Sequence, residues 1–445
     1  MKHFILFNSP IFWESKNDNE QYLPPIGLGY IATYLEKAGI DVEIIDCVKG
    51  KKSVAEIINI INSTEPDFIG INIFTQNYDI VKYIVESIKI ECVCFVGGQV
   101  VKSIYQDLLQ WDTKTRLNII IGEGELIIPQ IALGNCTQSP EVKTSRKNVY
   151  RVNAESTYFP MDISSICLNR KYLDNEVILN HYKEPEAAII TSRGCIYNCA
   201  FCGGARSLNS DVPVRIRSEE SIISEIQELL SLYPSITSVR VLDDLFLRNI
   251  KSIDMANHIF SQFPQISWRG MVHVLSLAGA LNKIKELKLG KCRELFIGIE
   301  SGSDKIRRKI NKLGDISSIV NVSKEILHNG IDLKGYFIYG FPGETRDDFQ
   351  KTYELASTIR QISTNEPGTF RTSVFQFRPY HGTQLYNEII ETIGIIHSCK
   401  FNEIISQFEG RSQFNFEFGN YSLEPDNLLN DYIIKTQELT EVKDD

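Results

Sequence analysis

The sequence of 445 residues has no long hydrophobic run, which excludes a membrane-spanning helix from our expectations. A span needs about 20 consecutive apolar residues. The apolar start, MKHFILFNSPIFW, is interrupted by Ser9 and Pro10 and is soon followed by the charged segment SKNDNE. A signal peptide also needs a longer apolar core. We therefore interpret the first residues as a buried strand and expect a cytoplasmic protein.

Basic residues are in deficit, and cysteine is too sparse for a disulfide framework. The chain has 47 Lys and Arg against 56 Asp and Glu, a formal net charge of −9. General nucleic-acid binders usually carry a basic excess, so we do not expect nucleic acid as a partner.

With only ten cysteines in the chain, a tight cysteine cluster indicates metal binding or catalysis. The length predicts two or three domains.

Residues 1–135 alternate between short apolar runs and amphipathic helical patterns. The runs are rich in β-branched residues, as strands buried on both faces are. They lie at residues 3–7, 42–46, 68–74, 93–97 and 118–122. Strand–helix alternation of this kind predicts an α/β domain, a Rossmann-like doubly wound parallel sheet.

Segments that contain glycine or polar residues follow four of these strands. Ligands of doubly wound sheets bind at the carboxyl ends of the strands, and glycine lets the backbone approach a large ligand. The segments are LPPIGLGYIA (23–32), FTQN (74–77), GGQ (97–99) and GEGE (122–125). Each alone is also explained by an ordinary turn, but together at one edge they favour a binding face.

The remaining chain divides into three parts. Residues 136–186 show little periodicity and are interpreted as a connector. Strand–helix alternation returns over residues 187–385 with six strands, which predicts a partial (β/α)6 barrel. A second open sheet fits the same periodicity. Residues 386–445 are polar and partly helical, and we treat them as a C-terminal extension.

Three cysteines lie within eight positions in the segment TSRGCIYNCAFCGGA. Cys195, Cys199 and Cys202 follow the first strand of the second alternating region, where a barrel builds its active site. Thiolates bind iron–sulfur clusters or structural zinc. Zinc sites usually have four protein ligands, and no further Cys or His lies within this loop. An iron–sulfur cluster with one open iron is favoured, and a zinc site is the alternative.

The C-x3-C-x2-C spacing resembles the signature of the radical S-adenosylmethionine (radical SAM) superfamily. Other segments resemble that family in the expected order: VLDDLF (241–246), FIGIESGSDKIRRKINK (296–312), GYFIYGFPGETRDDFQKT (335–352) and FRPYHGTQLY (377–386). The resemblance implies that the three cysteines hold a [4Fe–4S] cluster whose open iron binds SAM. The SAM contacts that it implies are Phe201, Gly203, Gly204, Glu300 and Ser301.

The first domain resembles the cobalamin-binding class of this superfamily, through P-x-G-L-x-x-I-A in residues 25–32. The cobalamin contacts that this resemblance implies are Pro25, Gly27, Leu28, Thr75, Gly97, Gly98, Gln99, Gly122, Glu123 and Gly124. The D-x-H-x-x-G motif of other cobalamin proteins is absent, which implies that no histidine of this motif binds cobalt.

The two resemblances together imply a radical C-methyltransferase. It would methylate an unactivated carbon of a small-molecule or peptide natural-product intermediate through a 5′-deoxyadenosyl radical and methylcobalamin. A flavodoxin- or ferredoxin-type reductant would supply electrons to the monomeric enzyme. Cyclisation or rearrangement without methyl transfer remains open. A methylthiotransferase fits less well, because the N-terminal cysteines lack cluster spacing, and a zinc-stapled module without activity is the non-enzymatic alternative.

Four residues are candidates for substrate chemistry. Asp243 and Asp244 end the second barrel strand, where capping the next helix is an equal alternative. Tyr339 lies near the end of a later strand and is also explained by core packing. His381 stands where the family normally has proline, and it is the first residue to mutate.

Overall fold

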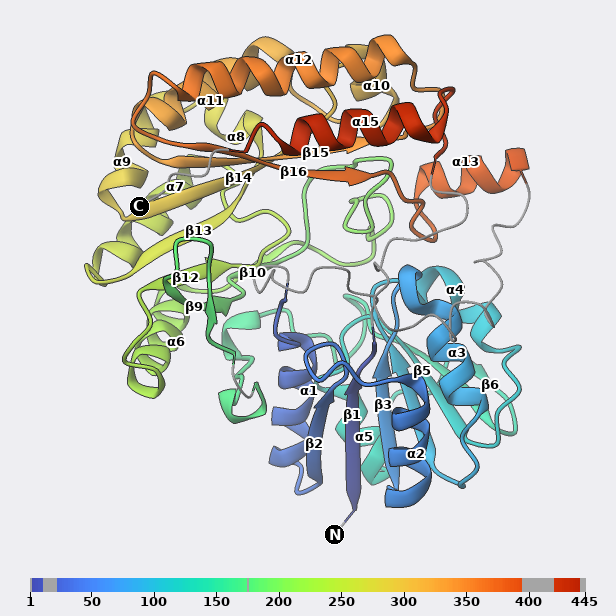
Figure 1. The fold of residues 1–445 in the computed structure, drawn as a ribbon. Coiled ribbons are helices and arrows are strands. Elements are labelled where there is room, and N and C mark those ends of the chain that lie inside the picture. The colour runs from blue at the N-terminus through green and yellow to red at the C-terminus, as the bar shows by residue number, and fades with distance from the viewer. Residues whose placement is uncertain (1, 11–21, 174–175, 394–419, 441–445) are drawn as a thin grey trace.

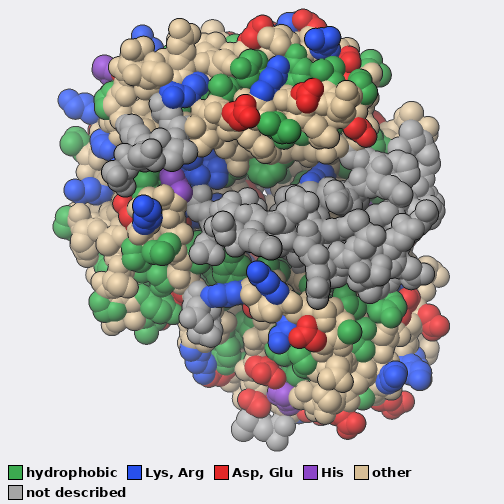
Figure 2. All heavy atoms as spheres, viewed as in Figure 1, with side chains coloured by type: hydrophobic (Ala, Val, Ile, Leu, Met, Phe, Trp, Pro, Cys, Tyr) green, Lys and Arg blue, Asp and Glu red, His purple; other side chains and the backbone are tan. Residues whose placement is uncertain are grey.

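The computed structural model describes residues 2–10, 22–173, 176–393 and 420–440 (Figure 1). Two α/β domains lie one above the other in this view, with the N-terminal domain below in blue to cyan. Within the described residues, no helix has both the length and the apolar character needed to cross a membrane. On the face shown in Figure 2, basic and acidic side chains are interspersed rather than separated.

The N-terminal domain is built on one mainly parallel sheet with strand order β2-β1-β3-β4-β5-β7-β6. Its strands are β1 (His3–Asn8), β2 (Asp41–Asp46), β3 (Phe68–Asn72), β4 (Val93–Gly97), β5 (Arg116–Ile121), β6 (Val142–Lys143) and β7 (Lys147–Arg151). The first five match the predicted runs. The last two lie in the expected connector, where β7 pairs in parallel with β5 and β6 is antiparallel. The sheet therefore extends beyond residue 135.

Helices cover both faces of this sheet. They are α1 (Ile26–Lys37), α2 (Val54–Thr64), α3 (Tyr78–Glu86), α4 (Val101–Leu108) and α5 (Ile127–Leu133), with a 3-10 turn η2 (Thr75–Asn77). A reciprocal capping box between Ser53 and Glu56 starts α2. Two separate apolar clusters, one containing Ile57 and Ile84 and the other Leu35 and Ile127, fill the two faces. The doubly wound prediction is confirmed.

The second domain is a half-barrel with strand order β16-β15-β14-β13-β12-β9-β8. The strands are β8 (Ile178–Leu179), β9 (Pro185–Ile189), β12 (Ser238–Val241), β13 (Ser267–Val272), β14 (Cys292–Glu300), β15 (Asp332–Tyr339) and β16 (Phe370–Gln376). From β9 to β16 all neighbours pair in parallel, while β8 is antiparallel. The predicted six-stranded partial barrel is confirmed. A small separate pair, β10 (Ser192–Arg193) and β11 (Arg215–Ile216), follows β9.

Helices pack outside the half-barrel (Figure 1). They are α6 (Glu219–Leu232), α7 (Ile250–Ser261), α8 (Val274–Ala278), α9 (Ile284–Leu289), α10 (Asp304–Lys309), α11 (Ile316–His328) and α12 (Arg346–Ser363), with 3-10 turns η3 (Ile163–Ser165), η4 (Arg170–Tyr172) and η5 (Leu281–Lys283). The pattern at 304–328 predicts one helix, but the structure has two. Gly314, with φ of 92°, interrupts the run, and Asp315 caps α11 through the Ser318 N–H.

The C-terminal extension contributes two described helices, α13 (Gln384–Ile393) and α15 (Asp426–Gln437). Leu429 and Tyr432 of α15 are buried in the barrel's apolar core. The Tyr339 hydroxyl is hydrogen-bonded to the Thr436 hydroxyl at 2.8 Å. Part of the extension therefore completes the barrel wall. The expectation of a frayed end at EVKDD lies outside the described residues.

An ion-pair layer closes the floor of the barrel. Arg269 of β13 is fully buried and donates to both oxygens of Glu186, at 2.6 and 2.7 Å. It also donates to Glu294 at 2.9 Å, and Arg371 of β16 binds the same Glu294 carboxylate. The barrel floor is therefore a layer of buried ion pairs.

Replacing Arg269 with methionine should lower the free energy of unfolding by about 3–5 kcal/mol, because a buried carboxylate loses its partner. Urea unfolding of the cofactor-free chain, followed by circular dichroism, measures this change. The control is Arg293→Met, whose side chain is 41% exposed and lies 3.8 Å from Asp332; it should cost less than about 1 kcal/mol. Equal effects from the two variants would contradict the role of the buried layer.

Candidate functional site: two adjoining cavities

The first cavity lies at the carboxyl ends of the barrel strands and has a volume of about 350 Å³. Cys195, Cys199 and Cys202 all line it, on the loop that follows β9 and β10. Burial raises the pKa of each thiol, for Cys202 to about 12. The thiols are therefore protonated at neutral pH, and binding iron would release their protons.

Asp243 holds the start of this loop. Its carboxylate accepts hydrogen bonds from the Thr191 N–H at 2.7 Å, the Thr191 hydroxyl at 2.5 Å and the Ser192 hydroxyl at 2.6 Å. Asp243 is 5% exposed and does not line the cavity. It therefore positions the cysteine loop and does not face the cavity.

The three thiols of the first cavity can be compared with the ligand sets of zinc and of an iron–sulfur cluster. Among the residues that the structure describes, no three His, Cys, Asp or Glu side chains are placed to hold a single metal ion. Zinc needs such convergence, because its ligands share one tetrahedral ion. In a [4Fe–4S] cluster each thiolate binds a different iron, so three thiols along one cavity wall suffice. The three cysteine thiols therefore fit the ligand set of a [4Fe–4S] cluster.

Glu300 and Lys312 form a buried ion pair in the cavity wall. The Lys312 ammonium donates to Glu300 Oε1 at 3.0 Å, and each side chain is 9% exposed. Glu300 has a φ of 65° beside a register shift between β14 and β15. A Cβ on Gly298 would lie 2.3 Å from Glu300 Oε1 and 2.8 Å from the Lys312 nitrogen, so a side chain there would displace this ion pair. Lys312 was not identified from the sequence, because the burial of its side chain depends on the register shift beside Glu300.

His273 and Tyr197 form an aromatic part of the wall that sequence reasoning also missed. Their rings stack with centroids 3.8 Å apart. His273 Nδ1 accepts from the Leu275 N–H at 3.2 Å, while its Nε2 has no hydrogen-bond partner among the described residues. Burial lowers the pKa of His273 to about 3, which keeps the ring neutral at pH 7. The signal in the sequence was the spacing of two between Met271 of β13 and His273, which directly follows the strand; both line the cavity.

Phe201 and Arg378 line the same cavity from other sides. The Phe201 ring contacts Phe341 edge-on, with centroids 5.7 Å apart. Arg378 is 9% exposed, and burial lowers its pKa to about 9. Gly204 lies behind Cys202, where a Cβ would stand 3.7 Å from its sulfur. The predicted SAM contact Phe201 therefore lies in the same cavity as an additional cation, Arg378.

Ser301 and Tyr339 are predicted site residues that lie away from both cavities. Ser301 is fully buried, and its hydroxyl contacts the Thr352 hydroxyl at 3.1 Å and accepts from the Ser303 N–H. Tyr339 points outward from the barrel to Thr436. Both residues tie helices to the barrel, and the structure gives them no access to a ligand in these cavities.

His381 joins the two domains rather than facing the cavities. Its N–H donates to the Thr75 hydroxyl at 3.2 Å, and its ring Nδ1 lies 3.0 Å from the same oxygen. A Cβ on the neighbouring Gly382 would lie 1.9 Å from the Ser103 hydroxyl oxygen of α4. Thr75, a predicted cobalamin contact, therefore binds His381. Gln99, another predicted contact, packs 3.0 Å from the Cβ position of Gly203.

His381→Ala should lower the free energy of unfolding by about 1 kcal/mol, because one side-chain hydrogen bond is lost. Turnover should be nearly unchanged. A double-mutant cycle with Thr75→Val, measured by urea unfolding, should show that the two changes are not additive. If the folded His381→Ala protein with all its cofactors lost turnover, this would instead indicate a catalytic role for His381.

The second cavity lies at the carboxyl edge of the N-terminal sheet and has a volume of about 810 Å³. Eight predicted cobalamin contacts line it, namely Pro25, Gly27, Leu28, Gly97, Gly98, Gly122, Glu123 and Gly124. Thr75 and Gln99 do not. Residues of the barrel domain, including Ile190 and Leu242, close the other side. The cavity is therefore enclosed by both domains.

The glycines of this cavity fall into two groups. Gly98 and Gly122 have φ of 140° and 99°, and a Cβ there would lie 2.3 Å from Ile73 O and 2.2 Å from Val152 O, so the backbone requires glycine. Gly27 has no heavy atom within 4 Å of a Cβ and lies in α1, where glycine is unfavourable by about 1 kcal/mol relative to alanine. Nothing in the fold requires Gly27, and its lack of a side chain leaves space for a ligand.

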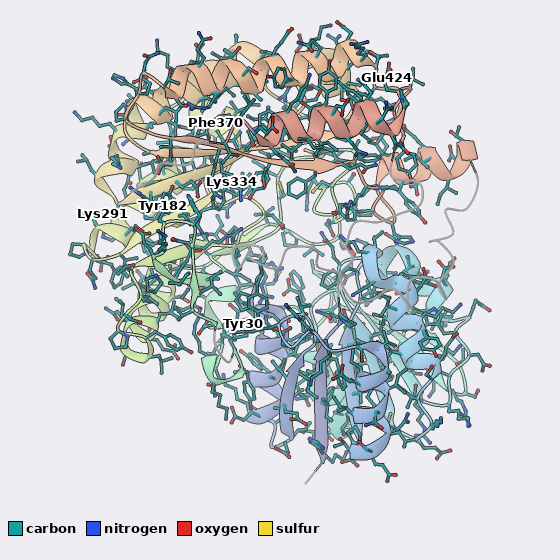
Figure 3. All side chains as sticks on the ribbon, viewed as in Figure 1. Tyr30, Tyr182, Lys291, Lys334, Phe370 and Glu424 are labelled. Carbon is teal, nitrogen blue, oxygen red and sulfur yellow. The ribbon has the colours of Figure 1, made fainter. Side chains whose placement is uncertain are left out.

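Glu123 and Glu125 of the GEGE turn bind arginines of the barrel domain. Arg193 of β10 donates to Glu123 at 2.6 Å and also pairs with Glu125, and Arg215 of β11 pairs with Glu123. The Arg193 guanidinium lies 5.1 Å from the ring of Tyr30, at the boundary between the domains (Figure 3). These ion pairs fix the glycine-rich edge against the loop that carries the cysteines.

Asp244 lines both cavities. Its carboxyl group lies 3.7 Å from the Cβ position of Gly204, on the cysteine loop. Burial raises its pKa, and a hydrogen bond from the Gly194 backbone opposes this shift. Asp243 and Asp244 both lie in the loop after β12, which ends at Val241 rather than at these residues as predicted. Asp243 binds the start of the cysteine loop, whereas Asp244 faces the cavities.

The architecture defines a protein with two large ligand sites, a thiol-lined one in a half-barrel and a glycine-lined one on a doubly wound sheet. Residues 189–356 match the radical SAM superfamily, and residues 18–132 match the B12 binding domain. The chain therefore contains a radical SAM domain and a B12-binding domain. It is therefore an enzyme whose cofactors are a [4Fe–4S] cluster, SAM and cobalamin, as the sequence resemblance predicts.

Several known proteins are similar to this chain. An uncharacterized methyltransferase of Pyrococcus horikoshii is 29% identical, over 78% of this chain and 77% of that protein. Cytidylyl-2-hydroxyethylphosphonate methyltransferase of Streptomyces wedmorensis is 22% identical, over 87% and 81%. The solved structure of the radical SAM methyltransferase TsrM from Kitasatospora setae, with cobalamin and a [4Fe–4S] cluster bound, matches over 99% of this chain and 89% of that chain. Its TM-score is 0.66 at 15% identity, a likeness of fold.

Proposed function

We propose that the protein is a cobalamin-dependent radical C-methyltransferase that methylates an unactivated carbon. The observation that carries this proposal is that the two cofactor cavities adjoin at Asp244. When bound, the cluster and SAM supply a hydrogen-abstracting radical, and cobalamin supplies the methyl group. The methyltransferases among the similar proteins support the same reaction class.

The overall reaction balances with two SAM molecules and two electrons. The substrate R–H, two SAM and two electrons give R–CH3, 5′-deoxyadenosine, methionine and S-adenosylhomocysteine. The C–H bond of the substrate breaks and a C–CH3 bond forms, and the hydrogen leaves in 5′-deoxyadenosine. The electrons come from a one-electron reductant of flavodoxin or ferredoxin type.

The chain's own residues bind and orient the reactants. Cys195, Cys199 and Cys202 hold the cluster, while Phe201 and the Glu300 region form the SAM side of the first cavity. The neutral His273 and the stacked Tyr197 narrow this cavity and exclude water. Gly27, Gly97 and their neighbours leave room for the corrin in the second cavity.

We further propose that the substrate is a small molecule or peptide intermediate. The cavity that holds SAM has only about 350 Å³, and the polar floor of the barrel closes it from below. Both named relatives with stated substrates use small ones: the Streptomyces enzyme acts on a cytidylyl phosphonate, and TsrM has been solved with tryptophan as substrate. A compact substrate seated at the boundary of the cavities fits this space.

The test is anaerobic turnover of candidate substrates with SAM that carries a deuterated methyl group. The methyltransferase should place the label in the product and release both 5′-deoxyadenosine and S-adenosylhomocysteine. Asp244→Asn, which keeps the shape but removes the charge, should reduce turnover with iron and corrin contents unchanged. Release of 5′-deoxyadenosine with an unlabelled, rearranged product would instead show the cyclisation or rearrangement alternative.

A further inference from the structure

Three apolar side chains are exposed around the loop that carries the cysteines. Ile196, which lies between the first two cysteines, is 48% exposed, Leu275 of α8 is 40% exposed, and Leu313, which follows α10, is 48% exposed. Single exposed apolar residues are common on protein surfaces, but several at one place mark an interaction site. We call these three residues the apolar patch.

Contacts between the described residues bring the three side chains of the apolar patch together. Next to Ile196, the Tyr197 ring stacks on the ring of His273, with centroids 3.8 Å apart. His273 directly precedes α8, so Leu275 follows two positions later. Gly314, the residue after the third member of the patch, has Leu275 Cδ2 3.7 Å from its Cβ position. The patch is therefore formed by three segments that meet at the cysteine loop.

The end of α10 is fixed directly against this loop. The Asn311 side chain donates to Asn198 O at 2.7 Å, and the Ala200 N–H donates to Ile310 O at 2.9 Å. Asn198 and Ala200 are the two neighbours of Cys199 in the chain. The apolar patch therefore borders the first two cysteines from the outside of the first cavity.

Basic residues flank the apolar patch. The segment 304–315, which contains α10, has five Lys or Arg against two Asp, although the whole chain has a net charge of −9. Three of these five basic residues are exposed, among them Arg308 in the last turn of α10. Arg206 is exposed on the other side of the loop, where its N–H donates to Tyr197 O at 2.9 Å. An apolar centre with a positive rim fits a partner whose surface is acidic.

A second route to the cysteines has the opposite charge. It is a cavity of about 390 Å³ that is lined by Cys199 and Cys202 and by Glu388 and Glu391 of α13. Like charges that face one another across an interface cost several kcal/mol, so an acidic partner fits this side poorly. The apolar patch is therefore the side on which an acidic protein can approach the cysteines.

We propose that the apolar patch and its flanking arginines are the docking surface for an acidic one-electron carrier that reduces the cluster. One electron passes from the carrier, which is oxidised, to the cluster, and it leaves when an S–C bond of SAM breaks to give methionine and the 5′-deoxyadenosyl radical. Electron-transfer encounters bury less than about 1,200 Å², so a small patch suffices. The inference rests on the reductant named in the proposed function and does not depend on methyl transfer.

The test compares two sources of electrons for the cluster-loaded protein. SAM cleavage is driven either by a reduced acidic flavodoxin or by dithionite, a small reductant that needs no docking surface. Arg308→Glu and Leu313→Ser should each slow the flavodoxin-driven release of 5′-deoxyadenosine about tenfold, because one reverses a rim charge and the other removes apolar contact. The dithionite-driven rate and the iron per chain should equal those of the wild type.

The matched controls are Lys89→Glu and Leu289→Ser. Both residues are exposed and lie before the amino-terminal ends of strands, Lys89 before β4 and Leu289 before β14. These variants make the same changes of charge and of apolar surface away from the cysteine loop. Their flavodoxin-driven and dithionite-driven rates should both equal those of the wild type.

Binding gives a measurement that is independent of turnover. The Kd of flavodoxin for the cluster-loaded protein, measured by biolayer interferometry, should rise about tenfold in Arg308→Glu and in Leu313→Ser, and the wild-type Kd should rise with salt. An unchanged Kd in both variants would overturn the proposal. Equal losses of flavodoxin-driven and dithionite-driven cleavage in both would also overturn it, because the cluster itself would then be affected.

The same variants test a second copy of this chain as the occupant of the apolar patch. A wild-type dimer in gel filtration that Leu313→Ser dissociates, with an unchanged Kd for flavodoxin, would assign the patch to self-association and overturn the proposal. Failure of methyl transfer in the wild type would leave the binding and SAM-cleavage measurements unaffected, so that it is distinguishable from failure of this inference.

Discussion

Cys195→Ala is expected to abolish the iron–sulfur cluster and all cleavage of SAM. The three thiols are the cysteines that line the first cavity, so the loss of one leaves too few protein ligands for the cluster. After anaerobic reconstitution, iron per chain and the brown visible absorption should fall to background, and 5′-deoxyadenosine should not form. Corrin binding should persist, because Cys195 does not line the second cavity.

The matched control for this prediction is Cys167→Ala. Cys167 is an exposed free thiol outside both cavities, so that its loss changes the number of cysteines but not the site. Iron content, colour and SAM cleavage should equal those of the wild type. Retention of a full cluster in Cys195→Ala would show that another group binds that iron and would contradict the assignment.

Gly27→Leu is expected to abolish cobalamin binding without destabilising the fold. A leucine at this position projects into the second cavity, where no protein atom lies within 4 Å of its Cβ. The helix α1 gains up to about 1 kcal/mol from the loss of glycine. Overlap with the ligand should cost at least about 1.4 kcal/mol of binding, a tenfold weaker affinity. Corrin absorbance per chain after gel filtration measures the effect, and iron content should not change.

Gly279→Leu provides the control for the added side chain. Gly279 is exposed at the end of α8, has a φ of −84° and also has no atom within 4 Å of a Cβ. This variant should bind cobalamin normally. Wild-type cobalamin content in Gly27→Leu would place the corrin elsewhere and remove the argument that Gly27 leaves space for it.

The fold was predictable where periodicity is strong. The first five parallel strands and the six barrel strands are apolar runs of sufficient length, and they form the predicted sheets. Strands β6 and β7 were not predicted. They have only two and five residues, of mixed polarity, which is too few to show a clear periodicity. The single helix predicted for 304–328 is divided at Gly314, which has a φ of 92° and packs closely against Val274. This contact is not visible in the local sequence pattern.

The candidate site was predictable to the extent that it resides in local motifs. The three cysteines and eight of the predicted cobalamin contacts line the two cavities. Contacts between distant segments were not predictable. Lys312 reaches Glu300 through a bulge, and His381 meets Thr75 across 306 positions of the chain. The assignment of individual SAM and cobalamin contacts stays a prediction.

The shared boundary at Asp244 has a kinetic consequence. Where two reactive groups act in sequence on one atom, the time that the atom spends between them decides how often it reacts with something else. The ion pairs of Arg193 with Glu123 and Glu125 prevent the two halves of the molecule from drifting apart during that interval. The two cavities are thereby held at a fixed separation, so that the reacting atom does not have to diffuse from one to the other. This geometry limits the side reactions of an exposed carbon.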